Sequence, residues 1–256
     1  MPDTPAMSRP FLRTWLILGP SSAAARAFAH RAAASGARII LAGRDNDDLQ
    51  AQASDLALRY GVPTVVQSFD ALDLASHPGF AVHCTAQSDG QLNIFAAIGV
   101  MPEQEALDRD RILLRQTIDT NFTGLVSVLA AFTPALEAQR GGTVMVMGSV
   151  AGDRGRPRNY LYGATKAALH TWLQGHAARL SRSGVRVVCL KAGVIDTAMT
   201  WALPKLPFMA RPDDFAKSAW ALAQGGSATA YVPRIWQLVM LVIRNVPTPI
   251  FNKMNF

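Results

Sequence analysis

The feature that most constrains this chain is the regular alternation of short apolar runs with helical stretches. An apolar run at residues 14–18 ends at Gly19-Pro20-Ser21-Ser22, and an alanine-rich stretch at residues 23–35 leads to a second apolar run at residues 37–42. Strands that are buried on both faces read as continuous apolar runs. The first part of the chain therefore predicts strand, turn, helix and strand, the repeating unit of a parallel sheet.

The same alternation continues over the rest of the chain. Further strands are expected at residues 62–69, 92–97, 142–147, 185–190 and 229–232, and further helices at residues 45–60, 110–136, 160–181 and 213–224. No repeat or linker divides these segments, so residues 1–256 are expected to form one α/β domain with a doubly wound sheet of about seven parallel strands and helices on both faces. Ligands of such a sheet bind beyond the carboxyl ends of its strands, where this sequence places Gly19, Gly43, Asp70, Gly99, Ser149 and Gly193.

Cysteine usage and charge exclude several classes of protein. Two cysteines, Cys84 and Cys189, are too few for the disulfide framework of a small secreted protein, which favours the reducing cytoplasm. The formal net charge is +7, but the basic residues are scattered and lack interleaved aromatic residues, so we expect no nucleic-acid partner. We expect no metal site either. From residue 215 onward there is no Asp or Glu, which favours an anionic substrate or an anionic lipid near that end.

The turn after the first strand has the small residues that a dinucleotide site needs. Gly19, Ser21, Ser22 and Ala24 let backbone amides approach a pyrophosphate at the N-terminus of the following helix. The end of the second strand then distinguishes NADP from NAD, because a carboxylate there binds the ribose hydroxyls and repels a 2′-phosphate.

At that second position the sequence has Gly43 followed by Arg44, whose guanidinium suits a phosphate. We therefore expect NADP(H) to be preferred over NAD(H). The alternative is that Arg44 is an ordinary exposed arginine and that Asp45 caps the next helix.

A tyrosine and a lysine lie four residues apart at the start of the helix expected at residues 160–181. Tyr162 and Lys166 therefore share one face of that helix. A nearby ammonium group favours phenolate, so we expect Lys166 to lower the pKa of Tyr162 and to let it exchange a proton with a carbonyl oxygen. The alternative is an ordinary amphipathic helix. Ser149 at a strand end, and Asn121 among apolar helical neighbours, favour the catalytic interpretation.

In order and spacing, Asn121, Ser149, Tyr162 and Lys166 resemble the catalytic tetrad of the short-chain dehydrogenase/reductase family. The turn from Gly19 resembles the glycine-rich turn of that family, with alanine at its second and third glycine positions, and residues 191–197 resemble its Pro-Gly-x-x-x-Thr segment. The resemblance implies a Rossmann fold and an NAD(P)-dependent oxidoreductase acting on a ketone or an alcohol. An alternative of another class is a cofactor-binding scaffold that has lost its chemistry.

The resemblance also implies a role for each matching residue. Tyr162 would be the general acid and base, Lys166 would tune Tyr162 and hold the nicotinamide ribose, and Ser149 would hydrogen-bond the substrate oxygen. Asn121 would hold a water molecule or a backbone kink in the proton path. The remaining cofactor contacts are expected from Asp70 and Ala71 near the adenine, Ala97 and Gly99 beside the adenosine ribose, and Val194 and Thr197 at the nicotinamide.

Two segments indicate the substrate. Residues 198–211 are expected to form a lid, with Met199, Trp201 and Phe208 as apolar contacts; the alternative is a loop packed back on the core. Just before Tyr162, three arginines alternate at residues 154, 156 and 158. We expect Arg154 and Arg158 to hold a phosphate or diphosphate of the substrate, with a solvated surface as the alternative.

The C-terminal extension, residues 234–256, combines an apolar stretch with flanking cations. It is expected to rest in a lipid interface, to pack over the active site or to contact another subunit. Its ending, together with residues 69–77, is similar to decaprenylphosphoryl-2-keto-ribose reductase-like members of the family, which implies a lipid-linked keto-sugar phosphate. A general keto-reductase of soluble or acyl-chain ketones is the alternative. The family resemblance further implies a homodimer or homotetramer through the helices around residues 118–136 and 160–181, in the cytoplasm, either free or in contact with a membrane.

Overall fold

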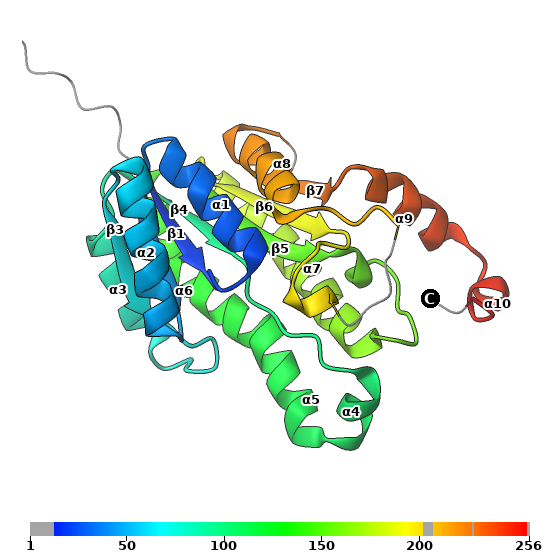
Figure 1. Ribbon diagram of the computed structural model, residues 1–256. Coiled ribbons are helices and arrows are strands. Elements are labelled where there is room, and N and C mark those ends of the chain that lie inside the picture. Colours follow the sequence, from blue (N-terminus) through cyan, green and yellow to red (C-terminus); the bar gives the residue numbers. More distant parts are fainter. Residues whose placement is uncertain (1–12, 202–206, 227, 255–256) are drawn as a thin grey trace, which may run out of the picture.

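A single parallel sheet of seven strands organises the computed structural model, which describes residues 13–201, 207–226 and 228–254. The order of the strands is β3-β2-β1-β4-β5-β6-β7 (Figure 1). Their bounds are β1 (Arg13–Leu18), β2 (Arg38–Gly43), β3 (Thr64–Ser68), β4 (Gln91–Ala96), β5 (Thr143–Ser149), β6 (Arg186–Ala192) and β7 (Thr229–Val232). The predicted α/β fold with a doubly wound, seven-stranded parallel sheet is confirmed.

Strand β1 shows why the apolar runs are continuous. Successive side chains of a strand point to opposite faces of the sheet. Trp15 and Ile17 therefore enter one core layer, and Leu16 and Leu18 enter the other. The first layer is covered by α1 (Ala23–Ala34), α2 (Asn46–Tyr60) and α8 (Pro212–Gln224), and the second by α3 (His77–Ala86), α6 (Gly124–Gln139) and α7 (Tyr160–Ser181).

The order of the strands reverses at β1, which pairs with β2 on one side and with β4 on the other. The crossover connections leave β1 and β4 in opposite directions, so a crevice opens beyond their carboxyl ends. Residues from the ends of several strands meet at this crevice.

The long helix predicted at residues 110–136 is interrupted. It consists of α5 (Arg111–Ile118), a π-helical turn (Asp119–Thr123) and α6. Four helices of the described residues were not predicted: α3, the short α4 (Gln104–Arg109), the short α10 (Thr248–Phe251) and the helix that the apolar C-terminal stretch forms. The apolar C-terminal stretch forms α9 (Ile235–Asn245), which projects beyond β7 (Figure 1). Over the described ranges, none of the helices has the length and hydropathy needed to cross a bilayer.

Candidate active site

A cavity of about 2040 Å³ lies at the carboxyl ends of the strands. Pockets for single small ligands measure roughly 300 to 1,000 Å³, so this cavity has room for a dinucleotide together with a second ligand. Its walls include residues from the ends of β1, β2, β4, β5 and β6, from the start of α7 and from the C-terminal segment. Among the described residues, no cluster of His, Cys, Asp and Glu has the makings of a metal site.

The turn that begins at Gly19 opens the N-terminus of α1 toward this cavity. Gly19 has φ +79°, a conformation that favours glycine, and an added Cβ would lie 3.1 Å from the carbonyl oxygen of Ala97. Ser22 makes no side-chain cap, and the first turn of α1 carries no acidic residue. The first amides of α1 are therefore available to an anion.

Helix α2 provides a contrast. Its N-terminus is capped by Asp45, which accepts from the amide of Asp48 at 3.1 Å, and its first turn is acidic. Asp45 therefore caps α2, as the alternative interpretation of Arg44 and Asp45 expected. At α1, the alanines that replace two glycines of the family pattern, Ala23 and Ala25, lie in regular helix and need no positive φ. Ala24, expected at the cofactor, is fully buried in the core and does not line the cavity.

The residues expected at the adenosine end of a dinucleotide lie beside the cavity. Gly43, Arg44, Asp70, Ala71, Ala97 and Gly99 all line the cavity, as do Ser21 and Ser22. Arg44 is exposed and forms no side-chain hydrogen bond or ion pair with any residue that the structure describes. The guanidinium of the nearby Arg26 is paired with Asp48 at 3.1 Å. Arg44 is thus the cation at this end that remains free for a ligand, within the described part of the chain.

Asn121 lies in the π-helical turn, where it is fully buried. Its Oδ1 accepts from the amide of Val100 at 2.7 Å, and its Nδ2 donates to the carbonyl of Val100 at 2.9 Å and to Thr165 Oγ1 at 3.3 Å. The side chain therefore ties the loop after β4 to α7. A Cβ at Gly99 would lie 3.3 Å from both Asn121 Oδ1 and Lys166 Nζ, so this glycine lets the two polar groups approach one another.

Lys166 is buried, and its Nζ donates to the carbonyl of Met147 at 3.1 Å. The same nitrogen lies 5.7 Å from the ring centroid of Tyr162. Burial lowers the pKa of Lys166 to about 8, so the ammonium form still predominates at neutral pH.

The expected effect of Lys166 on Tyr162 is wrong for this structure. Burial raises the pKa of the Tyr162 phenol above its ordinary value, and the two groups that oppose this rise are the Ser149 side chain, through a hydrogen bond, and the charge of Arg156. The physical reason is that Tyr162 is desolvated while the Lys166 ammonium is directed to Met147. In the free protein Tyr162 is therefore a phenol, which has a proton to donate.

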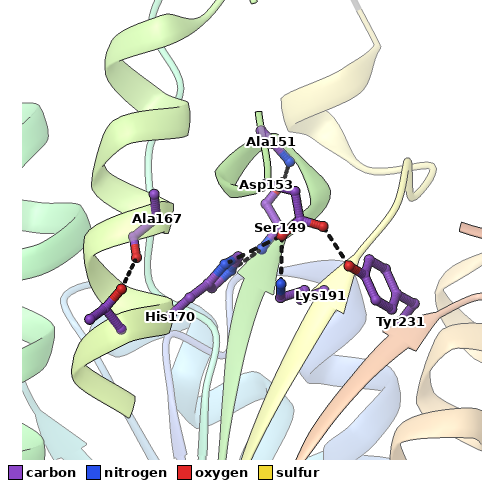
Figure 2. A network of polar contacts seen from close by, with 8 residues as sticks. Ser149, Ala151, Asp153, Ala167, His170, Lys191 and Tyr231 are labelled. Atoms are coloured by element: carbon purple, nitrogen blue, oxygen red, sulfur yellow. Dashed lines mark hydrogen bonds and ion pairs between the residues drawn. The ribbon is translucent and has the colours of Figure 1, made fainter. Parts of the chain in front are cut away.

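Ser149 is held by backbone and ring contacts at the end of β5 (Figure 2). Its Oγ accepts from the amide of Ala151 at 3.1 Å, and its own amide donates to His170 Nε2 at 3.3 Å. Burial lowers the pKa of His170 to about 4, so its ring is neutral at physiological pH. The Ser149 side chain also hydrogen-bonds Tyr162, and its hydroxyl can donate to a phenol or carbonyl oxygen in the cavity.

Behind Ser149 lies a buried charged network that the sequence did not reveal (Figure 2). The carboxylate of Asp153 accepts from Lys191 Nζ at 2.5 Å and from the Tyr231 hydroxyl at 2.6 Å, and its side chain is only 3% exposed. His170 Nδ1 lies 3.9 Å from the same carboxylate. One signal was available in the sequence: Lys191 directly follows an apolar strand, where a cation requires a buried counter-charge.

The far wall of the cavity is mostly apolar. Val194, Thr197, Met199 and Trp201 line it as expected, and Trp236, Val239, Ile243 and Met254 add a face from α9 and the chain end. Residues 202–206 of the expected lid lie outside the described residues. Phe208 does not line the cavity; its ring packs edge-on against Trp236, with the centroids 6.5 Å apart.

Helix α9 packs tightly over the carboxyl end of β6. A Cβ at Gly193 would lie 2.0 Å from the Trp236 indole nitrogen, so only glycine admits this contact. Of the placements expected for the C-terminal extension, packing over the site is therefore the one present in the structure.

Arg154 and Arg158 were both expected to hold a phosphate of the substrate, but only one of them lies at the cavity. Arg158 lines the cavity and is exposed at its edge. Arg154 does not line it. Its Nη1 donates to the carbonyls of Ile243 and Val246, both at 2.6 Å, and its guanidinium carbon lies 3.8 Å from the centroid of the Phe251 ring. Arg154 thus holds the C-terminal segment.

Comparison with known proteins agrees with this geometry. The family model described as short chain dehydrogenase matches residues 13–206. An uncharacterised oxidoreductase of Streptomyces coelicolor is 34% identical over 247 residues, which are 94% of this chain and 96% of the relative. The chain belongs to the short-chain dehydrogenase/reductase family. It is an NAD(P)-dependent oxidoreductase.

Two further similarities concern members with a stated activity. A sulfoacetaldehyde reductase of Chromohalobacter salexigens is 35% identical to this short-chain dehydrogenase/reductase over 191 residues, 72% of this chain and 73% of the relative. A solved structure of actinorhodin polyketide ketoreductase with NADPH superposes with a TM-score of 0.77, covering 88% of this chain and 97% of the other. At 17% identity the second similarity shows the fold alone.

Proposed function

We propose that this short-chain dehydrogenase/reductase reduces a ketone, or oxidises the corresponding alcohol, with NADP(H) and with Tyr162 as the general acid and base. The observation that carries the proposal is the meeting of Tyr162, Ser149, Lys166 and Asn121 beside one cavity, which also contains the open N-terminus of α1. A protein that only bound a dinucleotide would need the helix N-terminus but not the other four groups.

The residues divide the work of reduction as follows. A bound nicotinamide supplies the hydride. Ser149 donates a hydrogen bond to the carbonyl oxygen, and Tyr162 gives its proton to that oxygen as negative charge develops there. The raised pKa of Tyr162 keeps the proton on the phenol until it is needed. The Ser149 hydrogen bond stabilises the phenolate left behind. Lys166 would hold the nicotinamide ribose, and Asn121 fixes the loop beside it.

Arg44 supports the choice of NADP. It is the first residue after β2, it lines the cavity, and Gly43 takes the place of the carboxylate that would repel a 2′-phosphate. Gly19, Ser21 and Ser22 would hold the pyrophosphate. Val194 and Thr197, on the loop after β6, would orient the nicotinamide.

The apolar far wall supports a lipid-linked sugar phosphate as the substrate. Helix α9 contributes Trp236 and Val239 to the cavity, while Leu238, Leu241 and Val242 on its other side are 60–66% exposed. With the flanking cations Arg234 and Arg244, the outer side has the composition of a helix that lies in a membrane interface. Flotation with anionic vesicles tests this contact: Leu238→Ser/Leu241→Ser should lose vesicle binding and keep turnover of a soluble ketone.

A soluble anionic carbonyl compound is the second candidate, and the relative named for sulfoacetaldehyde favours it. As in other family members, a homodimer or homotetramer is proposed through α6 and α7. The outward residues Ala164 and Ala168 of α7 are small enough for close helix packing.

Stopped-flow oxidation of NADPH with a panel of ketones tests the proposed function. We expect oxidation with at least one ketone, faster than the background without substrate. A protein that binds NADPH tightly and oxidises it with none of them would instead be a scaffold.

A further inference from the structure

The loop between Ser149 and Tyr162 contains Arg156, the middle one of the three alternating arginines, to which the sequence analysis assigned no role. Arg156 is half-buried and lines the cavity together with Ser149 and Tyr162. Of its two neighbours in the alternating pattern, Arg154 is occupied by carbonyls of the C-terminal segment, and Arg158 is exposed. Arg156 is the arginine of this loop that faces the reaction centre.

The carboxylate of Asp153, whose charge acts on Arg156, already has hydrogen-bond partners for both of its oxygens. Asp153 binds Lys191 with one oxygen and the Tyr231 hydroxyl with the other, so the ion pair of Asp153 and Lys191 is neutral and closed (Figure 2). Across the ranges that the structure describes, the Arg156 side chain has no hydrogen bond or ion pair of its own. A desolvated guanidinium without a partner is costly, and it is commonly retained where a ligand provides the partner.

The charges around the phenol agree with this. Burial lowers the pKa of Arg156 from its ordinary value and outweighs the opposing electrostatic effects of Tyr162 and Asp153. A second cation, Lys166 Nζ, lies 5.7 Å from the centroid of the Tyr162 ring. With two positive groups near the phenol, this part of the cavity favours a substrate that brings negative charge.

We propose that Arg156 binds an oxyanion of the substrate, such as a carboxylate, sulfonate or phosphate ester, attached close to the carbonyl that is reduced. A guanidinium binds such a group with two parallel N–H donors, which fixes orientation as well as position. The anion would align the carbonyl with Ser149 and Tyr162. The inference rests on the proposed reduction of a ketone and narrows its substrate to anionic ketones.

The test compares matched ketones with and without charge. The pairs are acetoacetate with its methyl ester, and dihydroxyacetone phosphate with dihydroxyacetone, so that a carboxylate and a phosphate ester are separate arms. We expect Arg156→Gln to lower kcat/KM for the anionic member by about tenfold to a hundredfold, which is the loss of a charge-assisted pair. The neutral member should lose clearly less, because Arg156→Gln affects it only through the charge that acts on Tyr162. Arg156→Lys should recover part of the loss.

Arg182→Gln, an exposed arginine at the far end of α7, is the matched control and should change neither rate. Equal losses for charged and neutral ketones in Arg156→Gln would overturn the proposal, as would a loss of the preference in Arg158→Gln alone.

A binding measurement separates this proposal from the proposed function. Titration calorimetry of acetoacetate and of methylphosphonate into the protein loaded with NADP⁺, which cannot reduce a ketone, should show binding that Arg156→Gln removes. If that binding is present but no ketone is reduced, the proposed function fails and the anion site stands. If ketones are reduced but the binding of both anions is unchanged in Arg156→Gln, the proposed anion site is wrong and the proposed function stands.

Discussion

Arg44 is the residue on which the proposed preference for NADP depends. It has no partner among the described residues, and the strand before it ends in Gly43 rather than in an acid. A reversal of charge at this position should therefore act on the 2′-phosphate alone.

We expect Arg44→Asp to weaken NADPH binding by about tenfold to a hundredfold, because one charge-assisted contact is replaced by repulsion. NADH binding should change by less than about threefold, since NADH has no phosphate at this position. Fluorescence titration of both cofactors measures the two constants. Arg182→Asp makes the same change of charge far from the cavity and should leave both unchanged. Equal losses for NADPH and NADH would contradict the role of Arg44.

The helices and strands were predictable to different degrees. Strands β1, β2, β5 and β6 each contain a continuous apolar run, which made them visible in the sequence. The start of α7 was indicated by the spacing of Tyr162 and Lys166, which share one face of a helix. Helix α3 was missed because it begins with His77-Pro78-Gly79, which resembles a turn. The break at Asn121 was indicated only by the family resemblance, which implied a water molecule or a backbone kink there. The apolar pattern alone predicted one continuous helix, because the contacts of Asn121 with Val100 are distant in the chain.

The catalytic residues of the site could be predicted from their local spacing in the sequence, whereas the charged network behind Ser149 could not. Tyr162, Ser149 and Arg44 lie where a strand end or a helix start places them. The network of Asp153, Lys191 and Tyr231 joins residues that are distant in sequence, and no spacing rule connects them. For the same reason the partners of Arg154 on the C-terminal segment could not be predicted.

Helix α9 and the residues after it depend on Arg154 for their position. The two short bonds to Ile243 and Val246 and the stacking on Phe251 are lost in Arg154→Gln. Bonds of a charged donor contribute about 1.5 to 3 kcal/mol each, so local opening of residues 235–254 should become at least about tenfold more frequent. Hydrogen–deuterium exchange measured by mass spectrometry tests this. Faster exchange confined to the C-terminal peptides is expected, with Arg182→Gln as the control; unchanged exchange would show that α9 is held by its apolar contacts alone.

The stability of the whole molecule should depend on pH through its buried histidines. Burial lowers the pKa of both His170 and His176 to about 4. An unfolded histidine takes up a proton below about pH 6.5, whereas these two remain neutral in the folded protein until about pH 4. The unfolded state therefore binds more protons in this interval, and the free energy of unfolding is lost as the pH falls.

Each of these histidines should account for about 2 kcal/mol of that loss between about pH 7 and pH 5. His176 lies away from the cavity, where it bonds Thr133 at 3.0 Å, so it can be changed without disturbing Ser149. Urea unfolding of His176→Gln at both pH values should give a smaller acid-induced loss than the wild type, by about this amount. An identical loss in the two proteins would show that His176 is protonated in the folded state.

The most direct test of the proposed chemistry uses NADPH that carries deuterium at both C4 positions of the nicotinamide ring and follows this label to the product. With a ketone that the wild-type protein reduces, mass spectrometry should find the label on the carbinol carbon of the alcohol. Tyr162→Phe, which cannot donate the phenolic proton, should bind labelled NADPH as tightly as the wild type and form product at least about a hundredfold more slowly. Alcohol that forms without the label, or wild-type rates in Tyr162→Phe, would contradict the assignment of hydride transfer to this site.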